Sequence, residues 1–172
     1  RYPQLAVEED FFVNYGFVTP ELHARMHPRT ARQEWPAERW TQAQAVWHFV
    51  QQRSEAHPRE VDAHFAHGHT TNGFGGQSKA STQLLDGMHY RGLLRVARRE
   101  GGVRLYAAHD AHEREPAEAD AALDAMVDVA VGVYAPLPAA TLSMLVMWLG
   151  SVAAAQWRDR RAAGLARAKA RL

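Results

Sequence analysis

The sequence predicts a mainly α fold with a small β-hairpin wing, that is, a winged helix-turn-helix, and it is compatible with tandem winged-helix units. Apolar residues recur at intervals of three and four in several separate segments, which is the spacing of amphipathic helices. Between residues 94 and 106 the apolar period changes to two around a Gly-Gly pair, which is typical of a β-hairpin. Three helical segments precede this hairpin, in the order of a winged helix.

Composition narrows the class of protein. A chain of 172 residues with 47% hydrophobic residues is long enough to form one good core or two small ones. It contains no cysteine, which excludes disulfides, zinc fingers and thiol catalysis and fits a reducing cytoplasm. The first ten residues, RYPQLAVEED, lack the apolar stretch of a signal peptide.

Three parts are predicted along the chain: residues 1–39, a segment that packs on the core; 40–112, a winged-helix DNA-binding domain; and 113–172, a second helical, winged-helix-like domain. In the first part, an acidic start precedes the apolar-aromatic run FFVNYGFV. Thr19 followed by Pro20 then predicts a helix start, because threonine is a good N-cap and proline favours the first helical position.

Within 40–112, apolar spacing predicts a first helix over about 41–55, and HPREVDAHFA predicts a second, shorter helix. The stretch HGHTTNGFGG is interpreted as a glycine-rich loop. We expect Ser78 or Ser81 to cap a third helix, which Gly92 ends. The runs LLRVARR and VRLYA then form the two strands of the wing.

Residues 113–172 contain three further helical stripes. Their apolar positions are Leu123, Met126, Val127, Ala130 and Tyr134; Leu142, Leu145, Val146 and Leu149; and Trp157, Leu165, Ala168 and Leu172. No charged residue occurs from Val129 to Trp157, a length that could span a bilayer. Because Pro136 and Pro138 interrupt this stretch, we predict a buried helix pair and no membrane insertion.

Basic residues concentrate on the third helix and the hairpin, where residues 77–106 hold six cations against two carboxylates. Such a patch indicates an anionic partner. The third helix of a winged helix can enter a major groove while wing arginines hold phosphates. We therefore predict a monomer that binds double-stranded DNA, with the arginine-rich C-terminal helix as a second contact. The predicted DNA-binding residues are Ser78, Lys79, Thr82, Gln83, Arg91, Arg95, Arg98, Arg99, Arg104 and Tyr106.

Other site chemistries have weaker support. His64, His67 and His69 have ligand-like spacing, but they straddle a helix end and a loop and do not form the HExxH pattern, so no metal is predicted. The stretch NGFGGQS lacks the Gly-Lys-Ser/Thr ending of a nucleotide-binding P-loop. No cofactor is predicted, and the catalytic residues stay unknown.

The segment SKASTQLLDGMHYRGLLRVARREGGVRLYAAHD resembles the YcaQ-type winged-helix DNA glycosylases, which remove alkylated bases and unhook interstrand crosslinks. The matching positions are Lys79, Leu84, Leu85, Gly92, Leu93, Leu94, Arg104 and Tyr106. EEDFFVNYGFV, HPREVDAHFAHGHTTNGFGGQS and VYAPLP are similar as well, so the resemblance extends over most of the chain. It implies tandem winged-helix units followed by a β-barrel, and hydrolysis of the N-glycosidic bond of damaged purines.

The resemblance also implies a catalytic Gln-x-Gln or Gln-x-Asp pair ahead of the segment that matches YPQLAVEEDFF. Gln42 and Gln44 have the right letters but lie in the helix of a later unit, so the role is not carried over to them. Tyr15 and Phe17 stand where many relatives have tryptophan and histidine. We therefore expect the chain to be the middle part of such a protein, a DNA-binding core without the catalytic pair.

The resemblance predicts a cytoplasmic, nucleoid-associated DNA-repair protein. Two other interpretations stay open. A non-enzymatic winged-helix transcriptional regulator would bind a palindromic site as a dimer. A helical interaction module would use the surface from Leu142 to Trp157, and it would expose a large apolar patch.

Overall fold

The computed structural model describes residues 6–31, 33–66, 68–71, 76–110, 116–149 and 155–171. In these residues the fold is mainly helical, with three two-stranded antiparallel sheets. The chain forms two compact units, Arg1–Val7 with Gln33–Asp110, and Glu8–Arg32 with Ala111–Leu172. Each unit has a hydrophobic core of its own.

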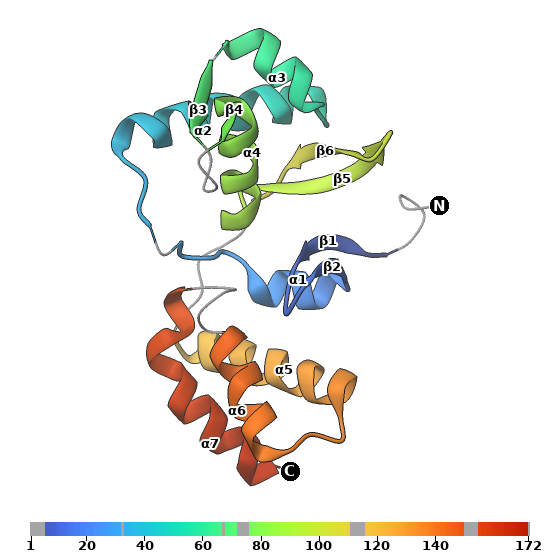
Figure 1. Cartoon of the computed structure of the whole chain (residues 1–172), viewed down its shortest axis with the longest axis vertical. Coiled ribbons are helices and arrows are strands. Elements are labelled where there is room, and N and C mark those ends of the chain that lie inside the picture. The colour runs from blue at the N-terminus through green and yellow to red at the C-terminus, as the bar shows by residue number, and fades with distance from the viewer. Residues whose placement is uncertain are drawn as a thin grey trace. The chain divides into compact units, whose positions relative to one another are not determined.

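The first unit contains the three predicted helices and the predicted hairpin (Figure 1). Its elements are α2 (Ala37–Arg53), α3 (Pro58–Phe65), β3 (His69–Thr71), β4 (Gln77–Lys79), α4 (Ala80–Arg91), β5 (Leu94–Glu100) and β6 (Val103–Ala108). Helix α2 begins earlier than predicted, because Pro36 already takes the N-cap position in extended geometry. The short β3–β4 pair was not predicted: β3 lies inside the stretch HGHTTNGFGG that was interpreted as a loop, and β4 follows directly after that stretch.

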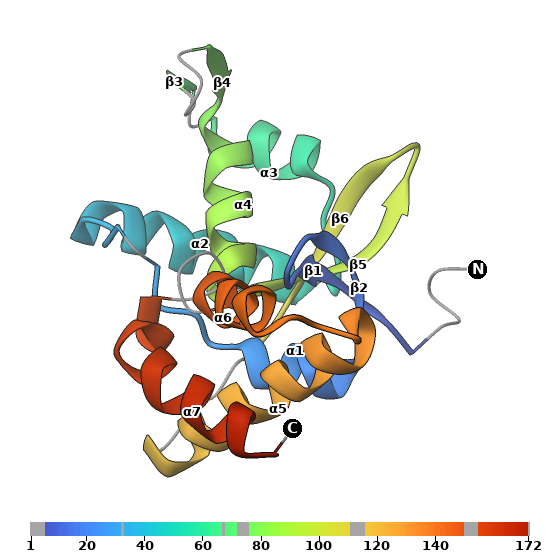
Figure 2. The same ribbon diagram turned by 60° about the horizontal axis from the view of Figure 1, so that its bottom comes forward.

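Glycines lie before the first strand of the hairpin and at its turn. Gly92 ends α4 in the left-handed conformation, with φ of 82°, as predicted. Gly101 and Gly102 have φ of 55° and 83°, the positive values that a tight two-residue hairpin turn needs. Strands β5 and β6 pair antiparallel with a register irregularity between Val96 and Arg98. The hairpin extends beyond the helices of its unit in both views (Figures 1 and 2).

The hairpin belongs to the core of the first unit. The buried residues come from α2, α3, α4 and the hairpin, and include Val46, Val50, Val61, Leu84, Leu85, Met88, Leu94, Val96 and Tyr106. Ala56, between α2 and α3, exchanges two backbone hydrogen bonds with Tyr106, of 2.8 and 3.0 Å. The hairpin is therefore fixed to the α2–α3 connection as well as to α4.

Within the residues that the structure describes, the second unit consists of helices and one β-hairpin. Its elements are β1 (Glu8–Phe11), β2 (Tyr15–Val18), α1 (Pro20–Met26), α5 (Pro116–Tyr134), α6 (Ala139–Trp148), the 3₁₀ helix η3 (Ala155–Arg160) and α7 (Arg161–Arg171). Thr19 caps α1 as predicted, because its hydroxyl accepts a 3.2 Å hydrogen bond from the Leu22 amide, with Pro20 at the start of the helix.

The N-terminal segment was predicted as residues 1–39, packing on the core, and its residues Glu8–Arg32 lie in the same unit as the C-terminal helices. The physical reason is the apolar face of α1, which packs on α5 and places Leu22 and Met26 in the core of α5 to α7. The β1–β2 hairpin was missed because FFVNYGFV has no glycine pair or alternating pattern to mark a turn.

The apolar stripes of the second unit were predicted well. The buried positions include Leu123, Met126, Val127, Ala130, Leu142, Leu145, Val146, Leu149, Trp157 and Ala168. Tyr134 is 42% exposed at the end of α5, so its assignment to the stripe was wrong. Leu172 lies outside the described residues. None of the helices in the described part of the chain is long and apolar enough to cross a membrane.

Candidate nucleic-acid interface

The predicted DNA-binding residues gather on α4 and the β5–β6 hairpin. Ser78 and Lys79 end β4 directly before α4, and Thr82, Gln83 and Arg91 lie on α4. Arg95, Arg98 and Arg99 lie on β5, and Arg104 and Tyr106 lie on β6. The structure therefore places the set on α4, the end of β4 that leads into it, and the β5–β6 hairpin, although the surroundings of its members differ.

Lys79 lies at the start of α4 and pairs with a carboxylate from α3. Its side chain is 50% exposed, and its ammonium group contacts Asp62. The Ser81 hydroxyl donates to the other oxygen of Asp62 at 2.7 Å. Hydrogen bonds from Lys79 and Ser81 lower the pKa of Asp62, so this carboxylate is ionised at neutral pH. The predicted cap by Ser78 or Ser81 was wrong, because Lys79 occupies the N-cap position.

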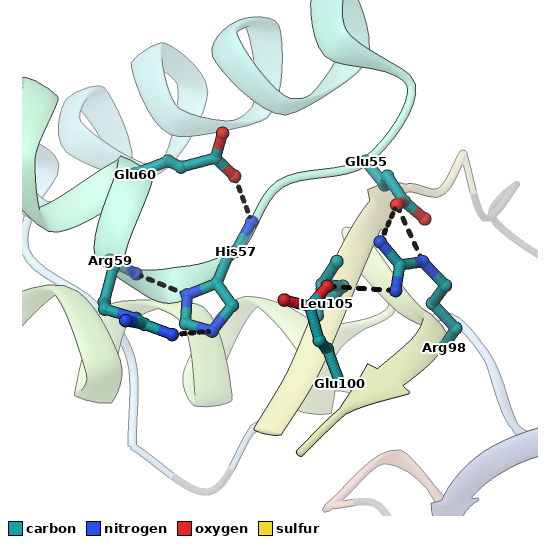
Figure 3. Close-up of a pocket in the computed structure, with 7 residues that line it drawn as sticks. All are labelled: Glu55, His57, Arg59, Glu60, Arg98, Glu100 and Leu105. Atoms are coloured by element: carbon teal, nitrogen blue, oxygen red, sulfur yellow. Dashed lines mark hydrogen bonds and ion pairs between the residues drawn. The ribbon is translucent and has the colours of Figure 1, made fainter. Parts of the chain in front are cut away.

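Arg98 on β5 is held by two carboxylates (Figure 3). Its Nε and Nη2 atoms lie 2.8 and 2.7 Å from Oε1 of Glu55, which lies between α2 and α3. Its Nη1 atom lies 3.2 Å from Oε2 of Glu100 on the same strand. These hydrogen bonds raise the pKa of Arg98 above its usual value. The guanidinium group is therefore a permanent cation with carboxylate oxygens on two sides.

Arg98 lines a pocket of about 470 Å³ beside the start of α3 (Figure 3). On the opposite wall, the His57 Nδ1 atom accepts a 3.0 Å hydrogen bond from the Arg59 amide. Glu60 accepts a 2.6 Å hydrogen bond from the His57 amide, which completes a capping box. The polar groups on this wall thus stabilise the first turn of α3.

Asp86 on α4 connects the helix to β6. Its Oδ1 atom accepts hydrogen bonds of 3.1 Å from both Arg104 Nη1 and the Tyr106 hydroxyl. Burial, together with the charge of Asp86, raises the pKa of Tyr106 to about 12, so the phenol stays protonated and donates. Tyr106 is only 3% exposed and belongs to the core, whereas Asp86 and Arg104 are accessible to solvent.

Arg91, at the end of α4, holds the segment before α2. Its guanidinium carbon lies 3.7 Å from the ring centroid of Trp35, which is a cation–π contact. Its two terminal nitrogens donate to the backbone oxygens of Gly87 at 3.1 Å and Gln33 at 2.9 Å. Partial burial lowers the pKa of Arg91 from its usual value. Arg91 and Tyr106 therefore support the fold of the unit, and the exposed cations of the predicted set are those able to reach a ligand.

Arginines of the C-terminal helical segment, predicted as a second DNA contact, form ion pairs with a row of aspartates on α5. Contacts of 2.6–3.7 Å join Arg160 of η3, and Arg167 and Arg171 of α7, to Asp120, Asp124 and Asp128. The carboxylates recur every fourth residue and so lie on one face of α5. These arginines have an intramolecular explanation, and a DNA contact by α7 is not needed to account for them.

A buried polar network in the second unit was not predicted at all. Oδ1 of Asp10 accepts from Arg29 Nη1 at 2.9 Å and from the Phe11 amide at 2.6 Å. Oδ2 of Asp10 lies 2.6 Å from His27 Nε2 and 3.3 Å from His23 Nε2. Burial alone would raise the pKa of Asp10, but the two histidines and Arg29 bring it far below its usual range. Burial lowers the pKa of His27 to about 3, so this imidazole is neutral.

The ligand atoms of Asp10, His23 and His27 lie within 4.8 Å of one another, which raises the question of a metal ion. Nitrogen ligands lie about 2.0–2.1 Å from zinc, so ligand atoms in a tetrahedral site are roughly 3.3 Å apart. The 2.6 Å separation of His27 and Asp10 is instead that of a hydrogen bond. Arg29 already supplies a positive charge to Asp10. The cluster fits a hydrogen-bonded ion pair better than a metal centre.

The histidine and glutamine motifs of the sequence do not converge on a site in the described residues. The ring of His64 stacks on Phe49 with centroids 4.6 Å apart, and His67 lies outside the described residues. Gln44 lines a second pocket, of about 450 Å³, together with Trp40 and Trp47. That pocket lies along α2.

Comparison with known protein families gives a match over nearly the whole chain. A family model described as DNA glycosylase AlkZ-like matches residues 7–171. No significant match was found among curated proteins or among solved structures.

Proposed function

We propose that this chain, which belongs to the AlkZ-like DNA glycosylase family, binds double-stranded DNA through α4 and the β5–β6 hairpin. The proposed ligands include damaged DNA. The observation that carries this proposal is the Asp86–Arg104 contact. This contact joins the exposed Asp86 of α4 to Arg104 on β6. A duplex could thus meet the helix and the hairpin together.

The element order supports a winged helix-turn-helix. Helices α2, α3 and α4 precede the β5–β6 hairpin. An isolated β-bridge between Ala56 and Tyr106 joins the α2–α3 connection to β6, which fixes the hairpin to the helices. In such a fold α4 would enter the major groove by its N-terminal turns. Lys79 and Thr82 lie there and are exposed.

The charges of the hairpin support contact with the phosphate backbone. Arg95, Arg98, Arg99 and Arg104 lie on its two strands, and guanidinium groups can bind phosphate oxygens with two hydrogen bonds. Phosphate contacts fix the position of a protein on a duplex but carry no sequence information. The hairpin would therefore supply affinity, while α4 would meet base edges.

In the full-length protein, the reaction proposed is hydrolysis of the N-glycosidic bond of alkylated or crosslinked purines. The catalytic residues are not assigned within this chain. Gln42 and Gln44 lie on α2, outside the buried face of that helix, and we propose no catalytic role for them. The protein is further proposed to act as a monomer in the cytoplasm, associated with the nucleoid.

Salt-dependent fluorescence anisotropy tests the DNA interface. The chain is titrated onto an intact duplex and onto the same duplex with an abasic-site analogue. Replacing Arg95 and Arg99 with glutamine should weaken binding and reduce the slope of log K against log salt by about 0.9 for each phosphate that is no longer neutralised. Replacing Arg167 and Arg171 on α7 with glutamine removes the same charge from the other unit and should leave binding unchanged.

The outcomes separate the alternatives. Preference for the abasic analogue supports a repair function, whereas equal binding to both duplexes supports a general DNA-binding module or a regulator. If both pairs of variants behave alike, the hairpin is not the interface. Absence of binding to either duplex at low salt would overturn the proposal.

A further inference from the structure

Three cations of the proposed interface are already paired with carboxylates from neighbouring elements. Asp62 on α3 holds Lys79, Glu55 between α2 and α3 holds Arg98, and Asp86 on α4 holds Arg104. In each case the cation lies on the hairpin or at the start of α4, and its partner comes from another part of the first unit (Figure 3 shows the Arg98 pair). The pattern recurs at both elements proposed to meet DNA.

These pairs are accessible to solvent and therefore exchangeable. Asp86 is 54% exposed and Lys79 is 50% exposed, whereas Asp10 and Arg29 of the second unit are each 1% exposed. Exposed ion pairs are weak because water and salt screen them, while a buried pair cannot separate without a large desolvation cost. A phosphate oxygen could displace the exposed carboxylates but not the buried one.

We propose that Glu55, Asp62 and Asp86 are masking carboxylates, residues that limit the affinity of the interface for DNA by occupying the cations that phosphates need. This inference rests on the proposed function. A duplex must displace each masking carboxylate before a phosphate can bind the corresponding cation. Sequence-independent binding depends almost entirely on phosphate contacts, so undamaged DNA is the ligand that the masking carboxylates disfavour most directly.

The alternative role for the same pairs is to brace the hairpin against the helices. The two roles predict opposite effects of removing a carboxylate on the affinity for DNA. If the pairs brace the interface, removing a carboxylate misplaces the hairpin and weakens DNA binding. If the carboxylates mask the cations, removing one breaks its pair with the cation and strengthens DNA binding.

The experiment measures binding of an undamaged duplex by the whole chain, over a range of salt concentrations. The variants are Asp86→Asn and a double variant, Glu55→Gln with Glu100→Gln, because Glu100 also pairs with Arg98. Each amide keeps side-chain shape and an acceptor oxygen but removes the charge. Each should bind about twofold to fivefold more tightly than wild type at low salt, the range expected for releasing one exposed pair. The salt dependence should steepen by up to about 0.9 for each cation freed.

Matched variants identify the cause of any gain. Asp128→Asn removes the same charge from an exposed pair with Arg171 on α7, and it should not change binding. Asp86→Glu keeps the charge and should bind like wild type. In an Arg104→Gln background, Asp86→Asn should give no gain, because no cation remains to be freed.

Each result has one meaning. Weaker or unchanged binding by Asp86→Asn and by the Glu55→Gln, Glu100→Gln double variant overturns the masking role, even when Arg95→Gln with Arg99→Gln still reduces binding and supports the interface itself. A gain that Asp128→Asn shares reflects net charge and also overturns it. If wild type does not bind the duplex at all, the proposed function and this inference fail together.

Discussion

Replacing Asp10 with asparagine should destabilise the second unit strongly, because this carboxylate balances a buried guanidinium group. Asp10 and Arg29 are each 1% exposed, and their side chains lie 2.9 Å apart. Asparagine keeps an acceptor oxygen but leaves the Arg29 charge without its partner. Removing one member of a buried ion pair costs about 3–5 kcal/mol, which is a large share of the stability of a small domain.

The same network makes the second unit sensitive to acid. The pKa of His27 is lowered from 6.5 to about 3 by burial, so between these values the unfolded chain binds a proton that the folded chain does not. The contribution of His27 to the free energy of unfolding is therefore at its maximum above pH 6.5, and it decreases as the pH falls toward 3. At pH 5 the loss from His27 alone is about 2 kcal/mol. The lowered pKa of Asp10 acts in the same direction, at lower pH.

Urea unfolding, with hydrogen exchange in α1 and α5 as the local readout, measures both effects. The matched control is Asp128→Asn, which removes a carboxylate that is 60% exposed and should cost no more than about 1 kcal/mol. A loss of unfolding free energy below about 1 kcal/mol in Asp10→Asn would refute the reasoning that Asp10 and Arg29 form a buried ion pair. Equal wild-type stability at pH 5 and pH 7.5 would refute the lowered pKa of His27.

Further predictions concern packing and hydrogen bonding. Gly87→Ala should destabilise the first unit by about 1–3 kcal/mol in thermal unfolding, because a Cβ there would lie 2.5 Å from the Trp35 ring that Arg91 holds in place. Gly132→Ala, at an exposed position of α5 with nothing within 4 Å, should instead stabilise by up to about 1 kcal/mol, and a loss like that of Gly87→Ala would contradict the contact argument. Tyr106→Phe removes the hydroxyl bonded to Asp86 and should cost about 0.5–1.5 kcal/mol in urea unfolding; an unchanged midpoint would show that this bond contributes nothing.

Elements with local signals could be predicted from the sequence. Thr19 before Pro20 marked the start of α1, Gly92 marked the end of α4, and the Gly101–Gly102 pair marked the turn of the hairpin. Each signal is a residue whose backbone preference fixes one conformation, so it needs no knowledge of the rest of the fold. The helical stripes were visible for a similar reason, since one face of each helix had to be apolar.

The polar contacts could not be predicted, because they depend on which elements meet. The members of the Asp10 network come from a strand, a helix and the segment after it, and no spacing connects them. In the sequence, Asp120, Asp124 and Asp128 are spaced four residues apart, which could have suggested an acidic helix face. Its pairing with α7 required the topology of the second unit.

For the predicted DNA-binding residues as well, the sequence indicated the element of each residue but not its contacts. Alternation correctly placed the arginines on the hairpin, but it could not show that Tyr106 turns into the core and that Arg91 stacks on Trp35. A register shift between Val96 and Arg98 breaks the period of two, so the face on which each strand residue lies could not be predicted from alternation alone.

The most direct test of the DNA interface is amide hydrogen exchange of the whole chain, with and without a duplex that carries an abasic-site analogue, at low salt. Contact through α4 and the hairpin predicts slower exchange in residues 79–83 and 98–104, with residues 161–171 of α7 unchanged. Protection confined to α7, or none in either region under conditions where the duplex is bound, would contradict the proposed interface.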